Sequence, residues 1–386
     1  MKSIARFAVA LLALVALLAA GVLLLRGGEE EPGARLLAAE PEIEGFARVE
    51  GPPGFDFPAD HGPHPAYQTE WWYYTGNLTA ADGRHFGYQL TFFRRALRPA
   101  DDVAERQSDW AATQVYMAHF ALVDVQSRDY VSFERFSRGA AGLAGAQSPP
   151  FRVWLEDWSV VQAADGTHHV LATANGVAID LMLTDLKGPA LQGDEGYSQK
   201  GEDPGNASAY YSLTRLQTQG EVRVGGASFT VEGLSWMDHE YSTSALSRGQ
   251  VGWDWFSIQL DDGSEFMLFT LRTDGGVDPY SHGLYVEADA SAATLHHRDG
   301  DYTIDALDTW RSAGTGAEYP ARWRVVIPER GVEVEIEPWL ADQEFEGSYS
   351  YWEGAVRVSG ERNGEPITGS GYVELTGYAG SMEGEF

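Results

Sequence analysis

The sequence contains no cysteine. Disulfides, cysteine-ligated zinc, thiol catalysis and a lipid-modified N-terminal cysteine are therefore excluded. Positively charged residues are also scarce. The chain has 27 Lys and Arg but 57 Asp and Glu, which gives a net charge of −30. The only lysines are Lys2, Lys187 and Lys200. Nucleic-acid binding needs basic patches that neutralise phosphate, and none is visible, so we expect no nucleic-acid partner.

Several catalytic motifs are missing as well. The chain has no G-x-x-x-x-G-K-[ST] phosphate loop and no dinucleotide fingerprint, so we expect no cofactor. Serine-hydrolase chemistry needs a G-x-S-x-G elbow between a strand and a helix. Gly369-Ser370-Gly371 lies in a strand-like context and lacks that elbow.

The N-terminus carries a long apolar run. Lys2 and Arg6 precede 19 uncharged residues, Phe7–Leu25, enough for a helix of roughly 28 Å at about 1.5 Å per residue. Residues 1–26 therefore predict a signal anchor, and a cleaved signal peptide is the alternative.

This segment also predicts where the body of the protein lies. Because basic residues before the run stay cytoplasmic, we expect the body in a periplasm, anchored to the inner membrane by residues 7–25. The alternative is a protein secreted after signal cleavage. Residues 27–45 predict an acidic, loosely structured linker.

The body, from residue 46 onward, consists of short runs that alternate apolar and polar residues. Turn signals of the ADG, DDG and NG type separate these runs. The composition, with 44 glycines and 12% aromatic residues, agrees with many turns and strands. No long amphipathic helix is visible. The pattern predicts an all-β fold of antiparallel sheets.

Two hairpin-like segments resemble each other. Residues 70–94 and 252–272 both read as an aromatic strand, an Asp-Gly turn and a second aromatic strand that ends in Arg. One interpretation is chance similarity between aromatic hairpins. The other is two related β domains, residues 46–245 and 246–386, that join near residues 242–250.

The first of these strands, in QTEWWYYTGNL, is aromatic on both faces. Glu70, Trp72 and Tyr74 share one face, and Trp71 and Tyr73 share the other, so we expect both faces to be covered. Small barrels of about eight strands can enclose one ligand in an apolar cavity. The sequence leaves open whether Glu70 is catalytic or is paired with an arginine such as Arg94.

The segment SWMDHEYST offers the sharpest candidate for chemistry. In a continuous strand, Trp236, Asp238 and Glu240 share one face and His239 lies on the other. An acid beside Trp in a poorly hydrated cavity has its pKa raised by desolvation, so Asp238 could donate a proton near neutral pH. The alternative is a turn at a strand end, with solvated or Arg-paired acids.

Histidine pairs raise the question of metal binding. His61 and His64 lie in HGPH, and His296 and His297 are adjacent. No coordination set with a recognised spacing is present, so we expect loop histidines and no metal.

Other aromatic and histidine residues are candidates for a pocket wall. His119 lies in an apolar strand and is either a core histidine or a pocket-lining one. Tyr210, Tyr211, Trp253 and Trp255 are likewise core residues or the lining of a cavity.

Seven motifs together resemble the AttH / carotenoid 1,2-hydratase family over roughly residues 45–386. They are TEWWYYTGNL, RHFGYQLTFFRR, YMAHFALVD, LQGDEGYSQKG, ASAYYSLTRL, GLSWMDHEYST and GWDWFSIQLDDG. The resemblance implies two lipocalin-like β domains, of barrel or sandwich type, with a cavity for an extended apolar molecule such as an isoprenoid or lipid. Hydratases of this family add water to a terminal isoprenoid double bond without a cofactor.

The resemblance also implies site residues. Asp238 matches the acidic position of the family motif, and the predicted catalytic residues are Asp238 and His239. The predicted substrate-binding residues are Glu70, Trp72, Tyr74, His119, Tyr211, Trp236, Trp253 and Trp255. The Asp-His-Glu-Tyr order is that of the exported branch, whose members are often encoded beside ABC-transporter permeases. The alternative function is therefore a non-catalytic, periplasmic ligand-binding accessory of an ABC transporter.

Overall fold

The computed structural model describes residues 44–99, 111–244 and 246–383. Within these ranges the chain consists of β-strands and their connections. The helical structure there is limited to single turns of 3-10 helix, η1 (Ala59–His61), η3 (His297–Asp299) and η4 (Pro328–Arg330). The predicted all-β fold is confirmed.

The predicted membrane segment lies outside the described residues. Residues 7–25 and most of the linker, residues 27–43, belong to this part, so the anchor and the linker stay predictions. Among the residues that are described, no helix has the length and apolar character needed to span a bilayer.

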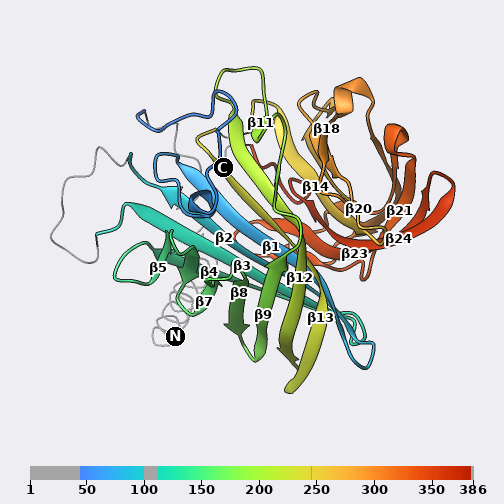
Figure 1. Ribbon diagram of the computed structural model, residues 1–386, viewed down its shortest axis with the longest axis horizontal. Helices are drawn as coiled ribbons and strands as arrows, with labels where there is room; N and C mark the ends of the chain where they lie inside the picture. The colour runs from blue at the N-terminus through green and yellow to red at the C-terminus, as the bar shows by residue number, and fades with distance from the viewer. Residues whose placement is uncertain (1–43, 100–110, 245, 384–386) are drawn as a thin grey trace, which may run out of the picture. The chain divides into compact units, whose positions relative to one another are not determined.

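The strands form two antiparallel sheets (Figure 1). The N-terminal sheet contains β1 (Thr69–Ala80), β2 (His85–Ala96), β3 (Gln114–Asp124), β4 (Asp129–Arg138), β5 (Ala144–Gln147), β6 (Arg152–Leu155), β7 (Trp158–Gln162), β8 (His168–Ala174), β9 (Val177–Asp185), β10 (Pro189–Leu191), β11 (Tyr197–Gln199), β12 (Ala207–Val224) and β13 (Ala227–Ser242). Their order is β4-β3-β2-β1-β13-β12-β9-β8-β7-β6-β5, and β10 and β11 also pair with β12.

The C-terminal sheet contains β14 (Gln250–Leu260), β15 (Glu265–Thr273), β16 (Gly276–Val277), β17 (His282–Val286), β18 (Ala292–His296), β19 (Thr303–Arg311), β20 (Glu318–Ile327), β21 (Val332–Pro338), β22 (Glu344–Glu346), β23 (Ser350–Arg362) and β24 (Glu365–Leu375). Their order is β18-β17-β15-β14-β24-β23-β21-β20-β19, with β16 on β15 and β22 on β23. Both sheets are strongly curled, as Figure 1 shows, which is the predicted lipocalin-like architecture.

The two sheets have one feature of topology in common: in each sheet the first strand pairs with the last. In the N-terminal sheet β1 pairs with β13, and in the C-terminal sheet β14 pairs with β24. The two predicted aromatic hairpins are β1–β2 and β14–β15, and each begins its sheet. The NG signals also form turns, since Asn175-Gly176 and Asn363-Gly364 have positive φ at both positions, as tight hairpins require.

The chain passes from one sheet to the other between Ser242 and Gln250. This stretch coincides with the predicted connector. The described residues nevertheless belong to one compact unit, so the division into domains 46–245 and 246–386 stays a prediction.

Alternation of side chains along the strands produces three apolar layers. On β1, Trp72 and Tyr74 enter the interior of the N-terminal sheet, whereas Tyr73 enters a layer between the two sheets. Trp323 and Trp352 belong to the interior of the C-terminal sheet. Both faces of β1 are therefore covered, as predicted.

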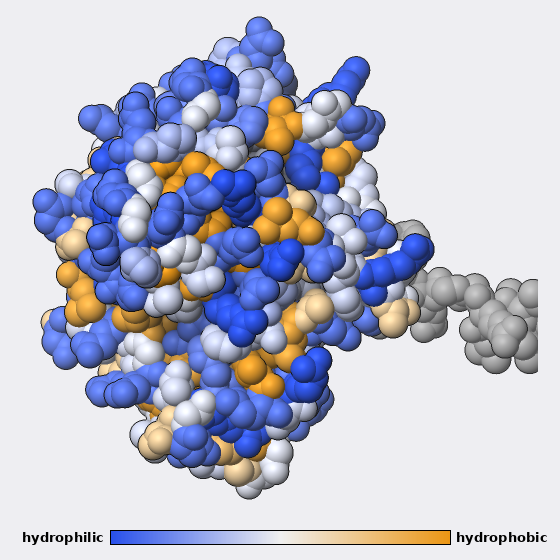
Figure 2. Space-filling view, turned by 90° about the vertical axis from the view of Figure 1, so that its right-hand side faces the viewer, coloured by the Kyte–Doolittle hydropathy of each residue, from blue (hydrophilic) through white to orange (hydrophobic). Residues whose placement is uncertain are grey.

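The outer surface is mostly hydrophilic. The face drawn in Figure 2 shows hydrophobic residues only in small, separate groups. Few large apolar side chains in the described ranges are exposed, and Leu186, at 52%, is the most exposed of them. The apolar residues are thus largely used in the three layers.

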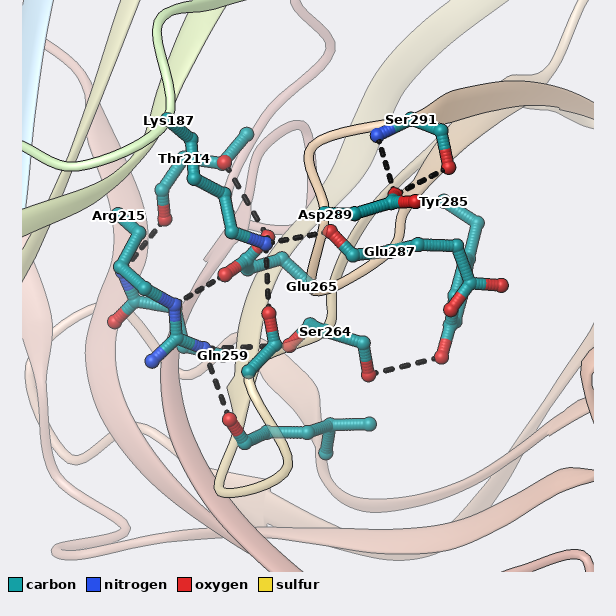
Figure 3. Close-up of polar contacts among 12 residues, drawn as sticks. Lys187, Thr214, Arg215, Gln259, Ser264, Glu265, Tyr285, Glu287, Asp289 and Ser291 are labelled. Carbon is teal, nitrogen blue, oxygen red and sulfur yellow. Dashed lines mark hydrogen bonds and ion pairs between the residues drawn. The ribbon is translucent and has the colours of Figure 1, made fainter.

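A buried ionic cluster ties the two sheets together (Figure 3). Glu265, the first residue of β15, is fully buried, and its carboxylate accepts a hydrogen bond from Lys187 Nζ at 2.7 Å and another from Arg215 Nε. Lys187 follows β9 and Arg215 lies on β12, so both cations come from the N-terminal sheet. Lys187 Nζ also donates to the carbonyl oxygens of Gly263 and Glu287, each at 2.7 Å.

Candidate functional site

A cavity of about 110 Å³ lies in the layer between the two sheets. One water molecule needs roughly 10–15 Å³ of such a cavity, so there is room for several waters or for part of an organic ligand. Most of the wall is aromatic, formed by Trp71, Tyr73, Phe93, Tyr210, Trp253, Trp255, Phe269, Tyr349 and Tyr351. The ionisable residues of the lining, tyrosines apart, are Asp238, Glu240, Glu374 and Lys200. We refer to this space as the inter-sheet cavity.

Asp238 is held in the wall by three hydrogen bonds. Its Oδ2 accepts from Tyr210 OH at 2.6 Å, and its Oδ1 accepts from Ser212 Oγ at 2.5 Å and Trp236 Nε1 at 2.7 Å. Tyr210 and Ser212 alternate along β12, the strand beside β13, so they share the face on which Asp238 lies. Trp255 Nε1 donates to Tyr210 OH at 3.1 Å, which links this group to the C-terminal sheet.

The environment of Asp238 favours its protonated form. Burial, with a smaller contribution from the nearby Glu240 charge, raises its pKa to about 7, although the hydrogen bonds from Ser212, Tyr210 and Trp236 oppose the shift. Oδ2 accepts a single hydrogen bond and so retains a lone pair for a proton. The buried carboxyl group of Asp238 can therefore hold a proton near neutral pH.

Two further acids lie in the same layer, on the C-terminal sheet. Burial, assisted by the nearby Asp238 and Glu240, raises the pKa of Glu374 to about 8. A 3.0 Å hydrogen bond from Trp253 Nε1 to Glu374 Oε1 acts in the opposite direction and lowers this pKa. Burial also raises the pKa of Glu353 well above its usual range, although Tyr73 OH donates to it. Acids from both sheets thus hold protons around the inter-sheet cavity.

Glu240 and Lys200 form an ion pair at the cavity wall. Lys200 Nζ lies 2.6 Å from Glu240 Oε1, and Ser208 Oγ donates to the same oxygen. The ammonium also lies 4.3 Å from the centroid of the Phe269 ring, a cation–π arrangement. The cation is already neutralised and offers little attraction to an anionic ligand.

The protonated acids predict a pH dependence of stability. Above about pH 6.5 the unfolded chain has ionised Asp238 and Glu374, whereas the folded chain keeps their protons up to about pH 7 and 8. The folded state therefore binds more protons, and its free energy of unfolding falls with rising pH, by about 1.4 kcal/mol per pH unit for each retained proton. Buried histidines such as His168 and His282, whose pKa values burial lowers, bind protons only in the unfolded chain, so they oppose this trend near their ordinary pKa of 6.5 and contribute little above about pH 7.

We expect the thermal midpoint of the full chain to fall between about pH 7 and 8.5, and to fall less in Asp238→Asn. Differential scanning calorimetry at several pH values checks this. A midpoint that rises over the range would contradict the assigned protonation of Asp238 and Glu374.

The predicted site residues divide into two groups on opposite faces of the N-terminal sheet. Trp253, Trp255 and Asp238 line the inter-sheet cavity, and Trp236 donates to Asp238. His119 also faces the C-terminal sheet, where its Nδ1 lies 2.8 Å from Tyr351 OH, but it is not part of the cavity wall.

The second group lies in the interior of the N-terminal sheet. Trp72, Tyr74 and Tyr211 pack there, and the buried side chains of Glu70 and His239 meet beside them. His239 is paired with Trp72 across β13 and β1, so its ring points away from Asp238. The structure therefore does not bring the predicted catalytic residues Asp238 and His239 to one cavity. Strand alternation places neighbouring residues on opposite faces.

The open question about Glu70 has a clear structural answer. Its Oε2 accepts a hydrogen bond from Arg94 Nε at 2.8 Å, and both side chains are fully buried. Arg94 lies opposite Glu70 on β2, and its charge, together with hydrogen bonds from His239 and His64, holds the pKa of Glu70 well below its usual range despite burial. Glu70 is thus a carboxylate, unlike Asp238.

Sequence reasoning missed the acids that the C-terminal sheet contributes. Glu353 follows Trp352, and Glu374 lies between Val373 and Leu375, so each is an acid within an apolar strand. A buried acid in such a run needs a partner or a proton, which is the signal that could have identified both. Lys200 was missed as part of the site too, whereas Tyr210 was among the candidates for a cavity lining.

The fold and the cavity define a class: all-β proteins with two curled, lipocalin-like sheets and an acid-bearing cavity between them. The profile of the AttH-like family matches residues 48–378, and the chain belongs to this family, as its motifs predicted. An AttH-type protein of Nitrosomonas europaea, with a known crystal structure, is 35% identical, with a TM-score of 0.77 over 86% of this chain and 99% of that one.

A second solved structure shows the same fold. Kievitone hydratase from Nectria haematococca is 15% identical, with a TM-score of 0.64 over 89% of this chain and 98% of that one. The comparison with curated proteins gave no match.

Proposed function

We propose that the protein is a cofactor-independent hydratase that adds water to a carbon–carbon double bond of an apolar isoprenoid or lipid. The observation that carries the proposal is Asp238, a buried acid with a pKa of about 7 in the wall of an aromatic cavity. The AttH-like family and the fold shared with a hydratase add support.

The proposed reaction starts with Asp238. Its carboxyl proton passes to the less substituted carbon of the alkene, which leaves a tertiary cation at the other carbon. The faces of Trp253, Trp255 and Tyr73 stabilise this cation and exclude bulk water. One water attacks the cation, and the proton that it loses returns to the Asp238 carboxylate. Glu374 holds its own proton near neutral pH and serves to bind the water rather than to accept a proton.

The charge of the cavity indicates the class of ligand. Asp238, Glu240 and Glu374 line it together with a single lysine, Lys200, which is paired with Glu240. An anionic head group would meet no unpaired cation among the described residues of this wall. We therefore propose a neutral, apolar substrate.

The test is incubation of the purified full chain with an acyclic carotenoid, a neutral isoprenoid alcohol or an unsaturated fatty acid, each in heavy-oxygen water. Mass spectrometry should find a tertiary alcohol that carries the heavy oxygen from one of the neutral substrates. A neutral ligand that stays bound and is recovered unchanged would instead favour the alternative, an exported ligand-binding accessory of an ABC transporter. Turnover of only the fatty acid would contradict the proposed ligand class.

A further inference from the structure

Three side chains that suit a metal ion meet inside the N-terminal sheet. His64 comes from the loop before β1, Glu70 from β1 and His239 from β13. Glu70 Oε1 lies 2.8 Å from His64 Nδ1 and 2.9 Å from His239 Nε2, and the three atoms all lie within 4.8 Å of one another. The cluster is on the face of β13 opposite Asp238, so it is separate from the inter-sheet cavity.

We propose that His64, Glu70 and His239 bind a divalent transition-metal ion, for which Zn²⁺ is the best-fitting occupant. Two imidazole nitrogens and one carboxylate oxygen are a typical zinc donor set, whereas Mg²⁺ and Ca²⁺ prefer oxygen ligands alone. Ligands about 2.1 Å from a tetrahedral ion lie about 3.4 Å apart. The two nitrogens would each need to move away from Glu70 Oε1 by only about half an ångström.

The surroundings orient all three ligands. Metal-binding histidines usually hydrogen bond through their second ring nitrogen to a carboxylate, a carbonyl or a water. His64 Nε2 lies 3.2 Å from Asp60 Oδ1, and His239 Nδ1 lies 3.1 Å from Tyr211 OH. The first contact is a carboxylate–histidine pair of the kind that supports zinc.

Arg94 supports the site without occupying the ligand position. Its Nε donates to Glu70 Oε2, which leaves Oε1 to face the two histidines. Its Nη2 donates to the carbonyl oxygens of His64 at 3.0 Å and Tyr67 at 2.9 Å, which fixes the loop that carries His64. The His64 main-chain N–H also donates to the Glu70 carboxylate, at 3.0 Å from Oε2.

The burial of the ligands suits a tightly held ion. The side chains of Glu70 and His239 are fully buried, and that of His64 is 16% exposed. An ion would therefore enter past the loop of His64, and once bound it would fasten this loop to β1 and β13.

The test uses the purified full chain, stripped of metal with a chelator and then titrated with Co²⁺. We expect one Co²⁺ per chain, with the visible absorption of a four- or five-coordinate ion that Zn²⁺ displaces. His64→Gln should weaken binding by at least about tenfold. The matched control is His169→Gln, because His169 Nε2 makes a comparable 2.7 Å contact with Asp180 at the surface. The control should bind like the parent chain.

Two results would overturn the proposal. One is Co²⁺ or Zn²⁺ binding that His64→Gln leaves unchanged in a folded chain. The other is a metal-stripped chain that takes up no ion and whose thermal midpoint does not respond to Zn²⁺. In that case His64 acts as an imidazolium between the Asp60 and Glu70 carboxylates. Neither result depends on the proposed hydration reaction.

Discussion

Asp238→Asn is expected to lower the rate of hydration by at least about a hundredfold, because general acid catalysis contributes about 10²–10⁴ to a rate. Asparagine has nearly the same shape, and its amide oxygen can still accept hydrogen bonds from Ser212 and Trp236, but it has no carboxyl proton to donate. The loss should appear in kcat, while the affinity for the apolar ligand changes little.

Steady-state assays of product formation, combined with a ligand-binding measurement, test this expectation. Asp254→Asn is the matched control. Asp254 is a partly buried acid, with a pKa that desolvation raises to about 6, but it pairs with Arg272 at 2.9 Å and does not line the cavity. A folded Asp238→Asn chain that turns over at the parental rate would remove Asp238 from the reaction. So would an equal loss in both variants.

Glu265→Gln is expected to lower the free energy of unfolding by about 3–5 kcal/mol, the usual cost of leaving buried charge without its partner. Glutamine retains the shape of glutamate, but it leaves the ammonium of Lys187 and the guanidinium of Arg215 without a counter-charge. Because these cations belong to the N-terminal sheet and Glu265 to the C-terminal one, the same change should weaken the association of the two sheets.

Chemical denaturation of the parent and variant chains measures this effect. Glu333→Gln is the control, since Glu333 pairs with Arg324 in an exposed ion pair, and such pairs contribute about 0–1 kcal/mol. If both variants lost the same free energy, the buried cluster would be no more important than a surface pair.

The all-β fold could be predicted because its determinants are local. Alternation of apolar residues indicates strands, and Asn-Gly and Asp-Gly pairs place the tight turns between them. The two aromatic hairpins were therefore visible as hairpins in the sequence. The same alternation correctly placed Asp238 and His239 on opposite faces, whereas the resemblance to a family proposed both as catalytic.

The site itself could be predicted only in part, because it depends on how two sheets pack. Asp238 and Trp236 were identified from one strand, and Trp253 and Trp255 from another. Glu374 joins them only because β24 returns to pair with β14 in the other sheet. No periodicity within one strand reports such a long-range contact. A cavity was expected inside a barrel, and the structure places it between the sheets instead.

The pairing of first with last strands also determines how the polypeptide must fold. Thr69 pairs with Ser242, and Asp254 pairs with Leu375, so each sheet depends on contacts between residues more than a hundred positions apart. Loop closure over such distances is entropically costly, and chains with high contact order fold slowly. A nascent chain cannot complete either sheet until the last strand of that sheet has been synthesised. Until then the first strand of the sheet has one unpaired edge, to which a chaperone can bind.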